Sequence, residues 1–425
     1  MSSRTRTTAE LVPKLRFPDF RGAGAWQPTT LQEASTPVAA RVGEKKLTPV
    51  SISAGIGFVP QAEKFGRDIS GNQYQLYTLV KDGDFVFNKG NSLKFPQGCV
   101  YLLQGWGQVA APNVFICFRL KDGYSNGFFQ NCFEQNQHGR QLKRHITSGA
   151  RSNGLLNISK ETFFGIEIST PAPAEQQKIA ECLSSADELM AAQARKVDAL
   201  KTHKKGLLQQ LFPRKGETQP RLRFPEFQNA AEWVERRLDT LCDIQRGKFS
   251  HRPRNDPSFF GGQYPFIQTG DVVKSAGGAV IASQSLNEQG LAVSKLFKPP
   301  IVLITIAANI GDTGLLQTEG CFTDSVVGLI PKKDVIPVFL ELMMRGQKER
   351  LNKVATTGAQ KNINNEILRG VSLLLPLLAE QQRIASCLSS LDALITTETQ
   401  KLEVLKSHKK GLQQQLFPST ERVTA

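Results

Sequence analysis

The sequence has no apolar run of the roughly 18 residues that a membrane-spanning helix requires. Its start, MSSRTRTTAELVPK, also lacks the apolar core of a signal peptide. Seven cysteines are present, but none forms a C-x-x-C pair, which argues against a disulfide framework and against a structural zinc site. We therefore expect a soluble cytoplasmic protein without structural metal.

Two nucleotide-binding signatures are missing as well. The sequence has no G-x-x-x-x-G-K-(S/T) phosphate loop, so we expect no translocase motor in this chain. No glycine-rich loop follows a predicted strand in the way that would hold S-adenosylmethionine. We therefore expect this chain to bind no cofactor.

Acidic residues are scarce relative to basic ones. Asp and Glu number 38 against 53 Lys and Arg, which gives a formal net charge of +15. This excess favours an acidic partner, with nucleic acid ahead of an anionic membrane surface. The 425 residues, 40% of them hydrophobic, are enough for two or three domains.

The most informative feature of the sequence is a long internal repeat. Residues 171–213 recur at 376–418, and about 26 of the 43 aligned residues are identical. A shorter repeat, KLRFPDF at 14–20, recurs as RLRFPEF at 221–227. Because repeats at a fixed spacing reveal the architectural unit, the chain is predicted to contain one plan twice. The predicted segments are a first variable domain at 1–170, a central helix at 171–213, a second variable domain at 214–375 and a C-terminal helix at 376–425.

Both repeated segments carry the heptad pattern of a long amphipathic helix. Apolar residues recur at steps of three and four, with polar interruptions at equivalent positions, Gln193 with Glu398 and Lys204 with Lys409. A helix over most of a 43-residue repeat would measure on the order of 55 Å. That is more than the roughly 34 Å of one DNA turn. The predicted helix-pairing residues are Ile179, Leu183, Met190, Val197, Leu200, Leu207, Leu211, Ile384, Leu388, Leu391, Ile395, Leu402, Leu405, Leu412 and Leu416.

Such a pattern is also typical of an ordinary core helix or of an oligomerisation coiled coil. The duplication favours pairing of the two helices within one chain, because each follows a variable segment of similar length. Lys204 and Lys409 would face each other in a parallel pair, so we expect an antiparallel coiled coil.

The variable segments are predicted to be mixed α/β (α+β) domains, here called heads. In the first head, two β-rich runs flank the turn at Lys81–Asp84, and a second strand-turn-strand is expected around Lys121–Tyr124. In the second head, YPFIQTGDVV, IVLITIAANIGDTGLL and SVVGLIPKKD are predicted strands, whereas VFLELMMRGQKERLNKV is predicted to be helical.

Basic and amide side chains in the heads are candidates for binding nucleic acid. Basic loops can contact phosphates, and glutamine can pair with adenine, although a solvated charged face or a plain turn would use the same residue types. The candidates in the second head are Arg246, Lys248, His251, Arg252, Arg254, Gln268 and Thr269. Those in the first head are Lys64, Arg67, Lys89, Asn91, Lys94, Arg140, Lys143 and Arg144.

The order of head, helix, head and helix resembles the specificity subunit of type I restriction-modification systems, over essentially the whole chain. The resemblance rests on PAPAEQQKIA with PLLAEQQRIA, the two HKKGL…QLFP endings, the paired LRFP(D/E)F segments, TTGAQKNIN at 356–364, YPFIQTGDV and NIGDTG at 309–314. In the first head only LLNIS, at 155–159, corresponds to the QKNIN of the second.

The resemblance implies that each head is a target recognition domain that reads one half of a split double-stranded DNA site. The paired helices would fix the spacer, and two different heads imply an asymmetric site. It also implies two methyltransferase subunits and restriction/translocase subunits as partners, which would use S-adenosylmethionine, ATP and Mg. The chain itself would be a non-catalytic DNA-recognition subunit.

Two other classes of function remain as alternatives. An enzyme fused to its recognition module would need catalytic motifs, but Asn255–Phe259 only approximates a methyltransferase loop, and Pro18-Asp19 with Glu44-Lys45-Lys46 only approximates a nuclease site. The repeat places the first of these nuclease residues in the LRFP segment, so we interpret it as structural. A coiled-coil scaffold that binds only protein is the other alternative.

Overall fold

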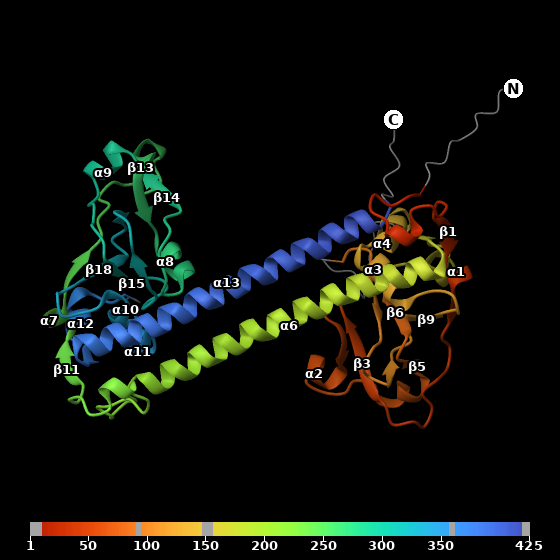
Figure 1. The fold of residues 1–425 in the computed structure, drawn as a ribbon, viewed down its shortest axis with the longest axis horizontal. Helices are drawn as coiled ribbons and strands as arrows, with labels where there is room; N and C mark the ends of the chain where they lie inside the picture. Colours follow the sequence, from red (N-terminus) through yellow and green to blue (C-terminus); the bar gives the residue numbers. More distant parts are fainter. Residues whose placement is uncertain (1–10, 91–94, 147–155, 357–361, 419–425) are drawn as a thin grey trace. The chain divides into compact units, whose positions relative to one another are not determined.

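The computed structural model describes residues 11–90, 95–146, 156–356 and 362–418. The chain divides into two compact units: unit 1 comprises residues 1–195 with 399–425, and unit 2 comprises residues 196–398. Figure 1 labels the two long helices, α6 (Pro173–Leu211) and α13 (Leu378–Leu416). Each unit therefore contains one head, the first part of one long helix and the last part of the other. No helix among the described residues has the length and apolar character needed to cross a membrane.

The head of unit 1 contains two four-stranded sheets and a short two-stranded one, with strand orders β4-β3-β8-β5, β2-β9-β6-β7 and β1-β10. Most neighbours are antiparallel, whereas β3 and β8 are parallel. The strands are β1 (Gln27–Thr30), β2 (Ser35–Pro37), β3 (Thr48–Ser53), β4 (Gly57–Pro60), β5 (Thr78–Lys81), β6 (Asp84–Asn88), β7 (Cys99–Leu102), β8 (Gln108–Ala111), β9 (Ile116–Leu120) and β10 (Glu167–Thr170). The helices are η1 (Pro18–Phe20), α1 (Leu31–Ala34), α2 (Gln61–Phe65), η2 (Gly71–Leu76), α3 (Asn126–Glu134), α4 (Gln137–Leu142), η3 (Lys143–His145) and α5 (Lys160–Phe164).

The head of unit 2 contains sheets of four, three and two strands, with orders β12-β18-β15-β16, β14-β13-β17 and β11-β19. Only β13 and β17 are parallel among these named strands. The strands are β11 (Val234–Arg237), β12 (Cys242–Arg246), β13 (Phe260–Ile267), β14 (Gln284–Leu286), β15 (Ile301–Thr305), β16 (Thr313–Leu316), β17 (Cys321–Phe322), β18 (Val326–Pro331) and β19 (Ser372–Leu375). The helices are η4 (Pro225–Phe227), α7 (Leu238–Leu241), η5 (Pro257–Phe259), α8 (Thr269–Ser275), α9 (Glu288–Ala292), α10 (Pro337–Gly346), α11 (Lys348–Thr356) and α12 (Asn365–Arg369).

The mixed α/β fold class and the two long helices predicted from the sequence are confirmed. The core of unit 1 is rich in phenylalanine: Phe85 stacks on Phe118, and Phe87 stacks on Phe163 with ring centroids 4.4 Å apart. The main core of unit 2 is instead mostly aliphatic, and β15, β18 and α10 are among the elements that contribute to it. The two heads thus share a fold class but differ in sheet composition and in core chemistry.

Each head begins and ends in one antiparallel ladder. In unit 1, β1 pairs with β10 from Gln27 opposite Thr170 to Thr30 opposite Glu167. In unit 2, β11 pairs with β19 from Val234 opposite Leu375 to Arg237 opposite Ser372. The first and last strands of each head therefore lie side by side, directly before the long helix that follows.

Two local predictions were wrong. The segment after the turn at Lys121–Tyr124 forms helix α3 rather than a strand, because Phe128, Phe129, Cys132 and Phe133 lie on one helical face and are buried. In the second head, the strand predicted across YPFIQTGDVV ends at Ile267, and the remaining residues form α8. A buried helical face outweighed the strand propensity of the residues concerned.

Candidate nucleic-acid interface and helix junctions

The repeated LRFP and EQQ motifs meet in an ion pair in each unit. In unit 1, Arg16 donates from Nε and Nη2 to the two carboxylate oxygens of Glu175, at 2.8 and 2.7 Å. In unit 2, Arg223 makes the same two contacts with Glu380, at 2.8 and 2.7 Å. All four side chains are at least 92% buried. Each arginine also donates to two backbone carbonyl groups, seven and eight residues further along the chain.

The first glutamine of each EQQ motif joins the long helix to its head. Gln176 accepts a hydrogen bond from the backbone N–H of Ser125 and donates to the carbonyl of Pro171. Gln381 likewise accepts from the N–H of Ile336 and donates to the carbonyl of the proline that begins the second repeat. Both glutamines are buried, so these bonds are protected from water.

The repeated tryptophan and the phenylalanine of the QLFP ending complete the same arrangement. Trp26 contacts Phe417 and Phe128 in unit 1, with ring centroids 5.8 and 5.4 Å apart. Trp233 contacts Phe212 and Phe339 in unit 2, at 6.1 and 5.8 Å. We call each cluster of ion pair, glutamine and aromatic rings a junction. Each junction joins the segment leading into a head, the start of one long helix and the end of the other.

Three of the four polar interruptions of the heptad pattern form ion pairs between the two long helices inside each unit. In unit 2, Lys204 pairs with Asp392 and Lys196 pairs with Glu398. Residue numbers rise along one helix as they fall along the other, so the helices are antiparallel there, as predicted. In unit 1, Lys409 donates to both carboxylate oxygens of Asp187 at 2.7 and 2.8 Å.

The predicted helix-pairing residues all lie on the less exposed side of their helices. Ile179, Leu183, Val197, Leu211, Ile384, Leu388 and Leu416 are buried, and Met190, Leu200, Leu207, Leu391, Ile395, Leu402, Leu405 and Leu412 are half-buried. Near the head of unit 1, Ile179 and Leu183 pack in one cluster with Leu416. This packing has the antiparallel direction that the Asp187 and Lys409 pair also has.

The basic loop of the second head, residues 246–254, lies next to Asp324, a carboxylate that was not predicted from the sequence. Arg254 and Arg252 approach Asp324 Oδ2 at 2.6 and 3.5 Å, and Arg246 donates to the backbone carbonyl of Asp324. Lys248 is exposed in the same loop, and its N–H donates to the carbonyl of Phe322. Four predicted cations therefore lie close to the short connection between β17 and β18.

Other candidates in the second head have structural partners. The His251 ring lies against Phe259, with centroids 4.1 Å apart, and its Nε2 lies 3.3 Å from Asp256. Gln268 is the N-cap of α8 and donates to Gln284. Thr269 is the first residue of that helix and is half-buried. At Gln268 and Thr269, strand β13 thus leads directly into helix α8.

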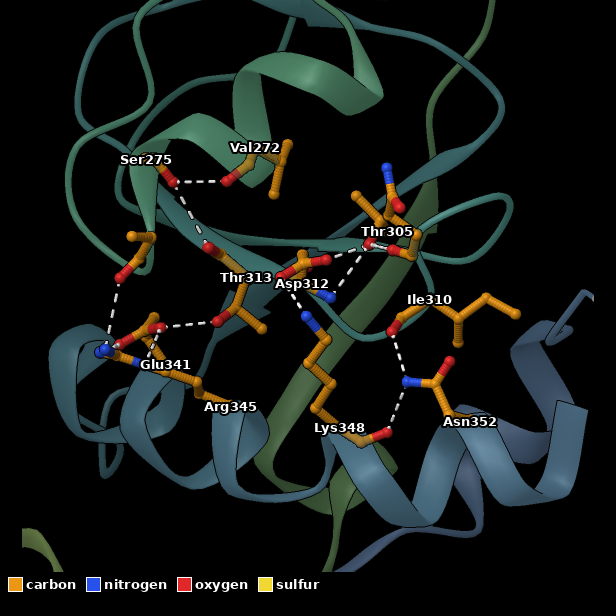
Figure 2. A network of polar contacts seen from close by, with 12 residues as sticks. Val272, Ser275, Thr305, Ile310, Asp312, Thr313, Glu341, Arg345, Lys348 and Asn352 are labelled. Atoms are coloured by element: carbon orange, nitrogen blue, oxygen red, sulfur yellow. Dashed lines mark hydrogen bonds and ion pairs between the residues drawn. The ribbon is translucent and has the colours of Figure 1, made fainter. Parts of the chain in front are cut away.

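The NIGDTG motif contains the last part of the connection between β15 and β16 and the first two residues of β16, and residues of α10 and α11 contact it (Figure 2). Thr313 donates to the buried Glu341, which also pairs with Arg345. Lys348 pairs with Asp312 at 2.6 Å. Burial raises the pKa of the Glu341 carboxyl, although the neighbouring Arg345 guanidinium and the hydrogen bonds it accepts act in the opposite direction. The motif therefore positions a rigid hairpin within the second head.

The candidates in the first head are spread over several elements. Lys64 donates to Ser51 and lies over the Phe65 ring. Arg67 is exposed and Lys89 is half-buried, with its backbone carbonyl accepting from Leu156. The remaining described candidates, Arg140 in α4 and Lys143 and Arg144 in η3, are exposed. Asn91 and Lys94 lie outside the described residues.

His138, which begins the basic HGRQLKRH stretch, does not belong to a charged surface. Its side chain is buried between Phe87 and Phe133, and burial lowers its pKa from 6.5 to about 4. The basic surface of this stretch is therefore confined to residues 140–145.

Comparison with known proteins agrees with this architecture. Residues 230–407 match the family described as type I restriction modification DNA specificity domain. The chain is 24% identical over 307 residues to the type I restriction enzyme MjaVIII specificity subunit of Methanocaldococcus jannaschii, covering 65% of this chain and 67% of the relative. It is 23% identical over 291 residues to the putative MjaX specificity subunit of the same organism, covering 68% and 67%.

Two solved structures share the fold. One is the crystal structure of a type I restriction-modification S subunit from M. genitalium, with a TM-score of 0.60, 13% identity, and coverage of 97% of this chain and 100% of that one. The other is a chain from a study of complex assembly and conformational transition of the type I R-M system, with a TM-score of 0.55, 19% identity, and coverage of 93% and 98%.

The family match spans the second head and much of α13, and unit 1 reproduces the same junction around the first head. Both halves of the chain thus follow the plan of the matched domain. Residues 230–407 match the type I restriction modification DNA specificity domain, and the chain is similar over about two thirds of its length to type I restriction enzyme specificity subunits.

Proposed function

We propose that this chain recognises a bipartite, asymmetric site in double-stranded DNA, with one head for each half-site. The observation that carries the proposal is the pair of equivalent junctions, which attach two heads of different sheet composition to the same helical framework. Equivalent attachment would present both heads to the duplex in a similar way, whereas different surfaces would select different bases. The net charge of +15 favours attraction to the phosphate backbone.

The helices would set the distance between the half-sites. Each long helix has 39 residues, and the interhelical ion pairs within each unit specify one register. A helix of that length measures about 58 Å, which exceeds one turn of B-DNA of roughly 34 Å. The spacer between the half-sites is therefore proposed to be unread DNA.

Methyl transfer and cleavage would belong to partners: two methyltransferase subunits and restriction/translocase subunits, which supply S-adenosylmethionine, ATP and Mg sites. The junctions are the proposed docking regions for the methyltransferases. In unit 2 the junction leaves Val234, Leu377 and Leu378 exposed, although they are large and apolar. Exposed apolar groups of this kind are typical of protein interfaces.

Selection of bound duplexes from a random-sequence pool tests the proposal directly. The full chain would be co-purified with a methyltransferase subunit of the same system, and bound DNA would be sequenced. We expect two conserved blocks of different sequence at a fixed separation. Capture of the methyltransferase without any DNA sequence preference would instead support the protein-scaffold alternative and contradict the proposal.

A paired set of variants locates each half-site. Replacing Arg252 and Arg254 with glutamine should weaken selection of one block and leave the other unchanged. Replacing Lys143 and Arg144 with glutamine is the matched change in the first head and should affect the other block. Equal loss at both blocks would contradict the assignment of one head to one half-site. Methyl transfer by the purified chain alone would contradict the division of labour with partners.

A further inference from the structure

Asp324 lies among three arginines, but only one of its two carboxylate oxygens faces a guanidinium group. Arg252 and Arg254 both approach Oδ2, whereas Oδ1 is buried and has no hydrogen-bond partner among the described residues. Arg246 bonds to the backbone of Asp324 and leaves its carboxylate untouched. One carboxylate therefore holds two guanidinium groups through a single oxygen.

Both arginines contact Asp324 from exposed positions, and Arg252 Nη1 also donates to the backbone carbonyls of Phe249 and His251. The side chains of Arg252 and Arg254 are 53% and 46% exposed, whereas that of Asp324 is 29% exposed. Ion pairs at this degree of exposure contribute about 1 kcal/mol or less each, because water and salt screen them. A DNA phosphate offers an arginine a comparable partner, so either guanidinium can move from the carboxylate to a phosphate with little net change in energy.

Backbone contacts hold this carboxylate beside the loop. Gly247 packs so closely that an added Cβ would lie 2.2 Å from the Thr323 carbonyl oxygen. The N–H groups of Gly247 and Lys248 donate to the carbonyls of Val326 and Phe322. The loop and the β17–β18 connection are thus fixed against each other, and a phosphate that approaches the arginines also approaches a fixed negative charge.

We propose that Asp324 is a specificity-determining residue that weakens the binding of the second head to DNA of any sequence. It occupies the arginines in the free protein and repels phosphates that compete for them. Stable binding then requires additional contacts with the correct bases, so discrimination between sites increases. This inference rests on the proposed DNA-binding function.

The test compares the full chain with its Asp324→Asn variant on a labelled random-sequence duplex, using fluorescence anisotropy over a series of NaCl concentrations. Removing the charge should tighten binding about tenfold at low salt, as expected for one charge acting over several ångströms at the protein surface. Each arginine freed for a phosphate should steepen the slope of log K against log salt by about 0.9. Two freed arginines would steepen it by roughly 1.8.

Asp334→Asn is the matched control, because Asp334 also pairs with an arginine, the half-buried Arg236, and its removal changes net charge equally. A change of the same size in both variants would overturn the proposal. In a background where Arg252 and Arg254 are glutamine, Asp324→Asn should alter the salt slope much less. A persistent full effect would show that these arginines are not the groups held by the carboxylate.

Two further outcomes separate this inference from its premise. If the unaltered chain binds no DNA even with its methyltransferase, the proposed function fails, irrespective of Asp324. If Asp324→Asn weakens binding to the selected site without strengthening binding to random DNA, Asp324 reads a base directly, as a carboxylate can with cytosine, and the proposal is wrong. An unchanged thermal midpoint for each variant confirms that folding is preserved.

Discussion

Removing one charge from the junction of unit 2 should destabilise that unit strongly. In Glu380→Gln the shape of the side chain is kept, but Arg223 loses its ionised partner while both groups remain more than 90% buried. Breaking a buried ion pair from one side costs about 3–5 kcal/mol. Because Arg223 retains two backbone carbonyl partners and the new amide keeps one acceptor oxygen, we expect a loss near the lower end, about 3 kcal/mol.

Scanning calorimetry of the full chain measures this effect. For a unit of this size, 1 kcal/mol shifts the midpoint by about 2–4 °C, so the transition of unit 2 should fall by roughly 6–12 °C. Glu175→Gln is the matched change in unit 1 and should lower the other transition by a similar amount. The two variants thereby also assign each transition to its unit.

A double variant distinguishes the cost of leaving a buried charge unpaired from the cost of changing the packing at that position. Replacing Arg223 and Glu380 together with methionine leaves no unpaired buried charge, so it should cost less than Glu380→Gln alone. A loss below about 1 kcal/mol in both single variants would refute the reasoning, because it would mean that water reaches the carboxylates. The recurrence of arginine and glutamate in the two halves of the chain would then need another explanation.

Two further changes test the packing of the heads. His138→Phe should remove an acid sensitivity of unit 1, because the folded histidine has a pKa lowered from 6.5 to about 4. This histidine should leave the unfolding free energy of the wild type unchanged above pH 6.5 and lower it by roughly 3 kcal/mol as the pH drops to 4. Urea denaturation at pH 7 and pH 4 should therefore show a smaller fall in the unfolding free energy of the variant. An unchanged pH dependence would contradict burial of a neutral imidazole. Gly247→Ala should destabilise unit 2 by about 1–3 kcal/mol, since its Cβ would meet the Thr323 carbonyl oxygen. Gly206→Ala, whose added Cβ would have no neighbour within 4 Å, should instead stabilise helix α6 by up to about 1 kcal/mol, and equal effects of the two substitutions would be inconsistent with the packing described.

The long helices and their antiparallel pairing were predictable from sequence because heptad periodicity and duplication are local signals. Even the polar interruptions had predictive value: Lys204 and Lys409 were expected to disfavour parallel pairing, and each has an acidic partner on the other helix. The mixed class of the heads followed from alternating strand and helix patterns. The division of eight strands of the first head into two four-stranded sheets did not, because strand order depends on contacts between residues distant in sequence.

The candidate interface was only partly accessible to sequence reasoning. Basic residues identified the loop after β12, but Asp324 lies some 70 residues further along the chain and carries no local signal of its proximity. The burial of His138 beside basic neighbours could not be read from the sequence, because residue type alone does not show whether a histidine is buried. The arginine and glutamate of the junctions did carry a signal, since both recur in each half, and that recurrence could have suggested that they are partners.

The ladder that closes each head has an evolutionary consequence. Because β1 pairs with β10, and β11 with β19, the chain leaves each head next to the point where it enters. Everything between those two strands can change in length, core chemistry or surface without moving the helical framework. If the proposed function is correct, each head would be a replaceable unit, and exchange of one head would give a new DNA preference while the helices and junctions stay the same.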